Sequence, residues 1–159
     1  AEATAAGEEP AAVLVSLRKM SRDNARTPMQ WDDSPNAGFT TGTPWLPVNP
    51  NYTEINAAPG NPVFDYYKRL IALRHTEPVV AHGDFTMLLP NDEHVYAFTR
   101  SLPGVELLTL GNFTGESMPV DLPGWAGTEL VIGNYPPDAN TDTLVLRPWE
   151  ARVYRRTIT

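Results

Sequence analysis

The chain has 159 residues, of which 42% are hydrophobic, and this length suits one domain or one domain with a piece of another. Its formal net charge is -7, from 12 basic and 19 acidic residues, which disfavours nucleic acid and anionic membranes as partners. It contains no cysteine, so disulfides, thiolate metal sites and cysteine catalysis are excluded. Neither a run of about 18 apolar residues nor a signal-peptide pattern occurs, so we expect no membrane span and a cytoplasmic location.

The first predicted element is a short helix over residues 10–20. Pro10 suits the first helical position, and Val13 and Leu17 recur at helical spacing. The sequence starts at Ala1 rather than at a methionine, so we expect that its N-terminus need not be a natural domain start.

Residues 23–61 follow neither a helical nor a strand period. They hold six prolines, three glycines and four large aromatic residues. Structureless loops longer than roughly 12–15 residues are uncommon in compact domains, and disordered segments are poor in aromatic residues. We therefore expect an ordered segment that lies against another structure.

The strongest helical pattern covers residues 61–78. Asn61 can cap the helix, Pro62 suits its first turn, and Pro78 ends it. One face follows the helical period with mostly apolar residues: Val63, Tyr67, Leu70, Ile71 and Arg74.

From Gly83 onward the period of the apolar residues becomes two. Seven short runs separated by turn-forming residues read as strands: DFTMLLP, HVYAFTR, ELLTLGNF, ESMPVDL, TELVIGN, DTLVLRP and EARVYRR. Seven short strands within about 75 residues predict an antiparallel β-sandwich.

Candidates for catalytic chemistry are few. Asp32 and Asp33 are adjacent on a loop, whereas a retaining glycosidase needs two carboxyl groups about 5 Å apart across a sugar, so we expect solvated or capping carboxylates. His75, His82 and His94 lack the spacing of a zinc site. The sequence has no nucleophile elbow, phosphate-binding loop or dinucleotide fingerprint, so we expect neither a metal nor a cofactor.

The four tryptophans are candidates for sugar-stacking platforms: Trp31, Trp45, Trp125 and Trp149. A Trp flanked by Pro and Gly more often anchors packing, and we favour packing here. Arg22 and Arg26 lie four residues apart with Asp23 between them. Chemistry alone favours structural ion pairs over ligand contacts for these arginines, because a buried Arg usually pairs a carboxylate.

Four segments are more specific. SRDNARTPMQWDDSPNAGFTTGTPWLPVNPNY, residues 21–52, strongly resembles a signature segment of the glycoside hydrolase family 13 α-glucosidases, and the oligo-1,6-glucosidase type is the most similar group. FDYYKRLIALRHTEPVV resembles the last barrel helix of these enzymes. GDFTMLLPNDEHVYAFTR and LRPWEARVYRR resemble the first and last strands of their C-terminal β-domain. The resemblance covers about residues 10–157.

This resemblance implies a part of a larger enzyme. The fold class it implies is mainly β: a C-terminal antiparallel β-sandwich over residues 82–159, preceded by a loop-and-helix remnant of a (β/α)8 barrel over residues 1–81. The complete enzymes carry three catalytic acids and a calcium-binding loop in upstream motifs that have no match here. No catalytic residue is therefore assigned, and the chain alone is expected to be inactive. Its implied partners are the missing N-terminal barrel segment and, only with that barrel, an α-glucoside oligosaccharide.

One residue role carries over. In the family, the first Arg of the RDNAR run reaches the closed end of the substrate pocket, pairs with an Asp from an early barrel loop and contacts the non-reducing glucose. Arg22 matches it, so the resemblance implies that Arg22 binds substrate and leaves Arg26 as a structural residue. The partner Asp is not in this chain.

Two alternatives remain open at this stage. Beside the enzyme segment, the chain could be a free-standing β-sandwich that binds polysaccharide through aromatic residues. It could also be a purely structural piece with no independent role. Coplanar exposed Trp side chains and affinity for starch or dextran would indicate the first. Aggregation through the apolar face of the second helix would indicate the other.

Overall fold

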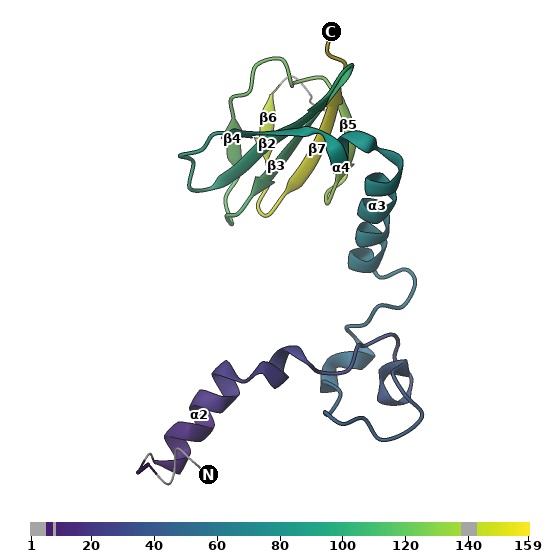
Figure 1. Ribbon diagram of the computed structural model, residues 1–159, viewed down its shortest axis with the longest axis vertical. Coiled ribbons are helices and arrows are strands. Elements are labelled where there is room, and N and C mark those ends of the chain that lie inside the picture. Colours follow the sequence, from purple (N-terminus) through teal and green to yellow (C-terminus); the bar gives the residue numbers. More distant parts are fainter. Residues whose placement is uncertain (1–5, 8, 138–142) are drawn as a thin grey trace. The chain divides into compact units, whose positions relative to one another are not determined.

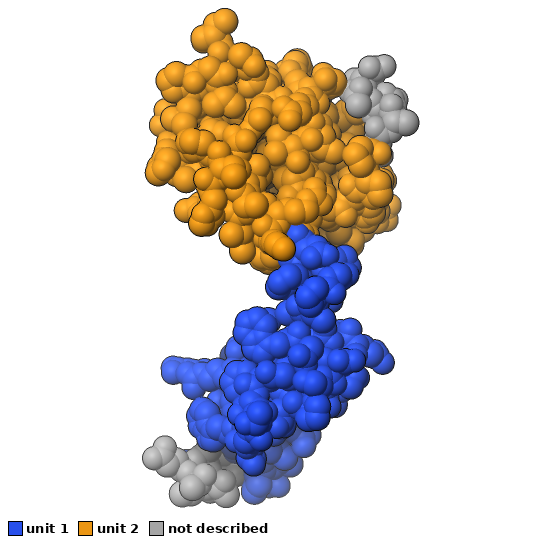
Figure 2. Space-filling view, turned by 90° about the vertical axis from the view of Figure 1, so that its right-hand side faces the viewer, with its two compact units in different colours: residues 1–65 blue, residues 66–159 orange. Residues whose placement is uncertain are grey.

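The computed structural model describes residues 6–7, 9–137 and 143–159. It divides into two compact units, residues 1–65 and residues 66–159, which Figure 2 shows in blue and orange. The first unit holds the predicted loop, and the second holds the predicted strands.

The first unit has little regular structure. Helix α2 spans Pro10–Met20, as predicted, with Pro10 in its first turn. Three short turns follow it: η1 (Arg22–Ala25), η2 (Pro35–Gly38) and η3 (Pro50–Thr53). Among the described residues of this unit only Pro28 and Ala37 are buried, so the unit has no hydrophobic core of its own.

Helix α3 spans Pro62–Thr76, close to the predicted limits. The Asn61 side chain caps it, because its Oδ1 accepts hydrogen bonds from two backbone N–H groups of the first turn, at 3.0 and 3.3 Å. Pro78 begins a second short helix, α4 (Pro78–His82), which the sequence did not predict. None of the helices in the described part of the chain combines the length and the hydropathy needed to cross a bilayer.

The second unit contains all seven predicted strands. A five-stranded sheet has the order β1-β2-β3-β7-β5, and a two-stranded sheet pairs β4 with β6 (Figure 1). Every pairing between these strands is antiparallel. The strands are β1 (Asp84–Leu88), β2 (Val95–Leu102), β3 (Val105–Asn112), β4 (Met118–Val120), β5 (Glu129–Gly133), β6 (Leu144–Leu146) and β7 (Ala151–Arg156).

One hydrophobic core joins the two sheets. Leu108 and Leu110 of β3 are fully buried and belong to the same cluster as Leu146 of β6. Trp125, which is 3% exposed, comes from the segment between β4 and β5, and its ring lies 4.1 Å from the guanidinium of Arg156. Two sheets that share a core in this way form a sandwich. The prediction of a mainly β chain with an antiparallel β-sandwich is therefore confirmed.

The opposite face of the five-stranded sheet is covered in part by α4, which packs against β2 and β3. Val79 of α4 and Leu107 of β3 are both almost completely buried. The chain enters β1 through Gly83, where an added Cβ would lie 2.6 Å from the carbonyl oxygen of Val79. Any larger residue at this position would push α4 away from the sheet.

A buried ion network links the turn between β6 and β7 to the core. Glu150 is 1% exposed and accepts hydrogen bonds from the backbone N–H of Arg147 (2.7 Å), the Arg147 guanidinium (2.8 Å) and the Arg152 guanidinium (2.7 Å). Arg152 also donates to the hydroxyl of Tyr154 (3.0 Å) and to the carbonyl oxygen of Val145 (3.0 Å). The network therefore ties strand β6 to strand β7 through one carboxylate.

Two opposing effects set the pKa of Glu150. Burial raises it, but the hydrogen bonds from Arg152 and Arg147 outweigh burial and lower the pKa from 4.5 to about 2. A carboxyl group with a depressed folded-state pKa stabilises the fold above its unfolded-state pKa. That contribution is lost as the pH falls through the folded-state value.

We predict that Glu150→Gln destabilises the sandwich. The substitution leaves the Arg152 guanidinium buried opposite a neutral amide, and breaking a buried ion pair in this way costs about 3–5 kcal/mol of unfolding free energy. Urea denaturation at neutral pH measures the loss. The control is Glu93→Gln, which changes an exposed carboxylate and is expected to cost about 0.5 kcal/mol or less. Equal losses in the two variants would contradict the structural role of Glu150.

The same pair of proteins gives a pH prediction. The stability difference between the unmodified chain and Glu150→Gln is expected to be full above pH 4.5 and to shrink as the pH falls toward about 2. Denaturation curves over that pH range measure it. A difference that stays constant down to the lowest pH would show that the charge of Glu150 does not carry the effect.

Candidate functional site

The candidate site is the segment that follows helix α2. Arg22 is the first residue of turn η1, whose start is capped because the Ser21 hydroxyl accepts a hydrogen bond from the backbone N–H of Asp23 (3.2 Å). The Asn24 side chain donates to the carbonyl oxygen of Arg18 in the last turn of α2 (2.7 Å). These two contacts fix the backbone on both sides of Arg22 relative to the helix.

Arg22 and Arg26 differ in their surroundings. Arg22 is exposed, and within the described residues its guanidinium makes no hydrogen bond or ion pair. Arg26 lies 4.0 Å from the Asp23 carboxylate, with both side chains about half exposed. Such an exposed pair contributes little stability. The structural ion pair considered for both arginines therefore exists for Arg26 and not for Arg22.

Gln30 connects two distant parts of the loop. Its side-chain amide donates to the carbonyl oxygen of Ile55 (2.5 Å) and to the Asn51 side chain (3.2 Å), and its backbone carbonyl oxygen accepts from the backbone N–H of Ala57 (2.8 Å). Asn49 adds hydrogen bonds to Thr27 (3.3 Å) and to Gln30 (3.5 Å). Residues 27–30 and 49–57 are therefore held side by side by amide groups rather than by apolar packing.

A second set of hydrogen bonds closes the turn between them. Asn36 and Ala37 both have a positive φ, 56° and 57°. The Asn36 amide donates to the carbonyl oxygens of Thr40 (3.1 Å) and Gly42 (2.9 Å), and the carbonyl oxygen of Ala37 accepts from the backbone N–H of Trp31 (2.9 Å). Asn tolerates the left-handed conformation, whereas Ala adopts it only where the surrounding structure enforces it.

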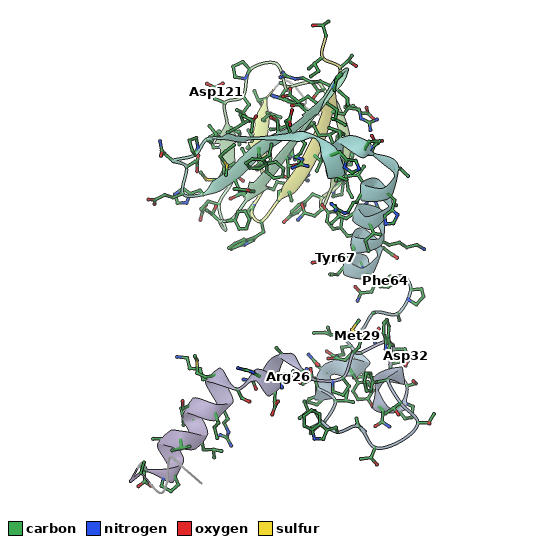
Figure 3. All side chains as sticks on the ribbon, in the orientation of Figure 1. Arg26, Met29, Asp32, Phe64, Tyr67 and Asp121 are labelled. Carbon is green, nitrogen blue, oxygen red and sulfur yellow. The ribbon has the colours of Figure 1, made fainter. Side chains whose placement is uncertain are left out.

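Asp32 is the capping carboxylate that the sequence suggested. Its Oδ1 accepts from the hydroxyl and the backbone N–H of Ser34, and these hydrogen bonds lower its pKa. The carboxylate also lies over Gly38, where an added Cβ would come within 2.8 Å of its oxygens. Figure 3 shows Arg26, Met29 and Asp32 along this one segment. Within the described residues Asp32 makes its contacts with Ser34 and with no second carboxyl group, so the geometry supports capping rather than acid–base chemistry.

The sequence predicts that residues 23–61 are ordered and lie against another structure. The structure shows one internal source of that order, which is the hydrogen bonding of side-chain amides. The residues that carry it are Gln30, Asn36, Asn49, Asn51 and Asn56. Amide residues are common in ordinary loops as well, so their abundance alone did not identify this network.

The loop also presents apolar side chains to solvent. Trp45 is 85% exposed and Trp31 is 51% exposed. Of the four tryptophans only Trp125 is a packing anchor within its unit, and the expectation of packing is wrong for Trp31, Trp45 and Trp149 in the chain as described. The other exposed apolar residues of the loop are Met29, Phe39 and Ile55.

The arrangement suits binding more than catalysis. An exposed guanidinium beside a rigid, aromatic loop can hold a polar ligand through charge-assisted hydrogen bonds and ring contacts. Among the described residues no group of three or more His, Asp or Glu side chains could hold a metal ion. His75, His82 and His94 lie apart in the sequence, on α3, at the end of α4 and before β2.

Comparison with known proteins identifies the family. A model of the α-amylase catalytic domain matches residues 2–83. The oligo-1,6-glucosidase of Parageobacillus thermoglucosidasius is 46% identical over 158 residues, which cover 94% of this chain and 28% of that protein.

Two solved structures are similar along nearly the whole chain. An isomaltulose synthase mutant from Erwinia rhapontici NX5, in complex with its natural substrate sucrose, has a TM-score of 0.81 at 41% identity and covers 97% of this chain and 29% of its own. The trehalose-6-phosphate hydrolase of Bacillus licheniformis has a TM-score of 0.81 at 34% identity and covers 98% of this chain and 30% of its own.

The chain spans about 28% of the length of the curated relatives that it matches. Most of each relative therefore has no counterpart here, as the resemblance in residues 21–52 implied. The matches confirm that resemblance, since the relatives are oligo-1,6-glucosidases and the family model is that of α-amylases. The chain belongs to the α-amylase family of glycoside hydrolases.

Proposed function

We propose that this chain is the C-terminal segment of a retaining α-glucosidase that hydrolyses short α-1,6- or α-1,4-linked glucosides. Residues 1–81 are the remnant of its catalytic barrel, and residues 82–159 are its C-terminal β-sandwich. The single observation that carries the proposal is the 46% identity to an oligo-1,6-glucosidase over 94% of the chain. The end of the catalytic-domain match at residue 83 supports the domain boundary.

In this proposal Arg22 is the substrate-binding residue. Its guanidinium is exposed and unpaired within the described residues, while the backbone around it is fixed to α2. A cation held in this way is free to pair with a carboxylate and a sugar hydroxyl that another part of the enzyme brings to it. Arg26, which already pairs with Asp23, has no such role.

A second candidate is a carbohydrate-binding sandwich. One observation favours it: Trp149 is 61% exposed, and its φ of 56° is unusual for a bulky residue. Its backbone N–H donates to the carbonyl oxygen of Thr114 (3.0 Å), the Asn134 amide donates to its carbonyl oxygen (2.8 Å), and both hydrogen bonds hold it in that conformation. We rank it below the enzyme segment, because the similarity to α-glucosidases extends along both units.

The isolated chain is predicted to be inactive. It offers no matched catalytic acid, so no turnover of a chromogenic α-glucoside is expected above the rate of a heat-denatured sample. A parallel titration with soluble starch should be flat. Turnover would contradict the proposal, whereas inactivity with clear starch affinity lost in Trp149→Ala would favour the second candidate.

A chimera tests the role of Arg22. This chain replaces the matching region of the Parageobacillus thermoglucosidasius oligo-1,6-glucosidase in one polypeptide. Arg22→Gln is expected to lower kcat/KM about 10- to 100-fold, because it removes charge-assisted hydrogen bonds. The control Arg26→Gln should change kcat/KM less than about threefold. An inactive unmodified chimera, or equal effects of the two variants, would contradict the assignment.

Gln30 is predicted to position the loop that carries Arg22. In the same chimera Gln30→Ala removes three amide contacts, and we expect a several-fold rise in KM with a smaller change in kcat. The matched control is Asn91→Ala, an exposed amide in the turn after β1. A loss of thermal stability with an unchanged KM would show that Gln30 serves only the fold.

A further inference from the structure

Helix α2 ends in a turn that reaches back to it. The last four carbonyl groups of an α-helix have no partner within the helix and need another donor. The first of them, that of Leu17, accepts from the backbone N–H of Ser21 (2.9 Å). The next, that of Arg18, accepts from the side-chain amide of Asn24 in turn η1 (2.7 Å). Asn24 therefore caps the C-terminal end of α2 from outside the helix.

Arg22 lies inside the loop that this hydrogen bond closes, because the bond joins residues 18 and 24. Two shorter contacts tighten the same loop. The carbonyl oxygen of Ser21 accepts from the backbone N–H of Asn24 (3.3 Å), and the Ser21 hydroxyl accepts from the backbone N–H of Asp23 (3.2 Å). These two contacts of Ser21 act within the turn, whereas the Asn24 amide joins the turn to the helix.

Asparagine suits this position for a chemical reason. Its amide nitrogen is a donor on a short side chain, whereas an aspartate of the same size would offer only acceptors to a carbonyl oxygen. The contact is exposed, and a hydrogen bond in water contributes only about 1 kcal/mol to stability. Its main effect is therefore on the position of the turn rather than on the stability of the chain.

The Arg22 side chain has no contact that would place it independently. Among the described residues nothing binds its guanidinium, so the backbone of η1 alone sets where this group lies. The ion pair between Asp23 and Arg26 is 4.0 Å long and exposed, and such a pair is too weak to hold the turn. A binding group must be held within about 0.5 Å of its working position, and a misplacement of about 1 Å can cost a hundredfold in rate.

We propose that Asn24 is a positioning residue for Arg22. Its amide holds turn η1 at the end of α2 and thereby places the Arg22 guanidinium for the sugar. The inference rests on the proposed function, in which Arg22 binds substrate. Asn24 donates to a backbone carbonyl group and acts on the substrate only through Arg22.

A double-mutant cycle in the oligo-1,6-glucosidase chimera tests this coupling. The four proteins are the unmodified chimera, Asn24→Ala, Arg22→Gln, and the chimera with both substitutions. For each we measure kcat and KM with a chromogenic α-glucoside, and the melting temperature by circular dichroism. Two residues that act through one interaction give effects that are not additive, whereas independent residues give additive ones.

Asn24→Ala is expected to lower kcat/KM about 5- to 20-fold. Most of the loss should appear as a rise in KM, because a contact made equally to bound substrate and transition state affects KM and leaves kcat nearly unchanged. In the Arg22→Gln background the same substitution should change kcat/KM less than about twofold, since the group that Asn24 positions is already gone.

Thr128→Ala is the matched control. The Thr128 hydroxyl also donates to a nearby backbone carbonyl oxygen, that of Trp125 (2.6 Å), but it lies on the second unit and shares no partner with Arg22. Its effect on kcat/KM should stay below about twofold and be the same in both backgrounds. If Asn24→Ala does not fold, Asn24→Ser enters the cycle instead, because serine keeps a turn-forming residue but shortens the donor.

Three outcomes would overturn the inference. Equal losses from the Asn24 substitution in both backgrounds would show that Asn24 acts independently of Arg22. A lower melting temperature with an unchanged KM would show that the cap serves only the helix. An inactive unmodified chimera would overturn the proposed function and this inference together, whereas an active chimera with additive effects would overturn this inference alone.

Discussion

The structure of the second unit depends on one constraint: the five-stranded sheet carries large apolar side chains on both of its faces. Large apolar side chains on either face of a sheet lose hydrophobic stabilisation when that face is left in water. The inner face meets the two-stranded sheet and buries Leu108, Leu110 and Leu146. Among the described residues, α4 packs on the outer face and the end of α3 lines a cleft beside it; Val79 and Leu107 are buried there, but Phe85 and Met87 of β1 stay exposed. The inner face of the sheet is thus buried, whereas part of its outer face stays exposed to solvent.

The first unit is held together by hydrogen bonds rather than by a hydrophobic core. It buries almost no apolar surface, yet its loop follows a defined path because amide side chains satisfy the backbone groups that a helix or strand would otherwise pair. Gln30 joins the two arms of the loop, and Asn36 closes the turn between them. Each such hydrogen bond contributes only about 1 kcal/mol when water competes for it, so this order would be much stronger beneath an apolar cover. Arg22 sits where that order begins.

Much of the fold was predictable from local chemistry. Asn61 and Pro62 set the start of α3, and the two-residue period located all seven strands, because both signals act over a few neighbouring residues. The sequence predicts that Pro78 ends the preceding helix, because proline disfavours a helical conformation in the residue before it. The fixed φ of the same proline also suits the first turn of α4. The positive φ of Ala37 and the contacts of Gln30 depend on residues far along the chain, and no local pattern reports them. Arg22 is singled out only by the family motif, because no contact within the described residues distinguishes it from other exposed arginines.

The four tryptophans differ in solvent exposure, so their fluorescence reports on different parts of the chain. Trp125 is enclosed in the sandwich core beneath the Arg156 guanidinium, whereas Trp31 and Trp45 stand on the loop of the first unit in contact with water. Indole emission moves to shorter wavelength when water is excluded from the ring. Emission from Trp125 therefore reports whether the sandwich is folded, and emission from Trp31 and Trp45 reports whether anything has covered the loop. Trp149 is 61% exposed on the second unit and also emits at long wavelength, so a Trp149→Phe variant separates the loop signal from it.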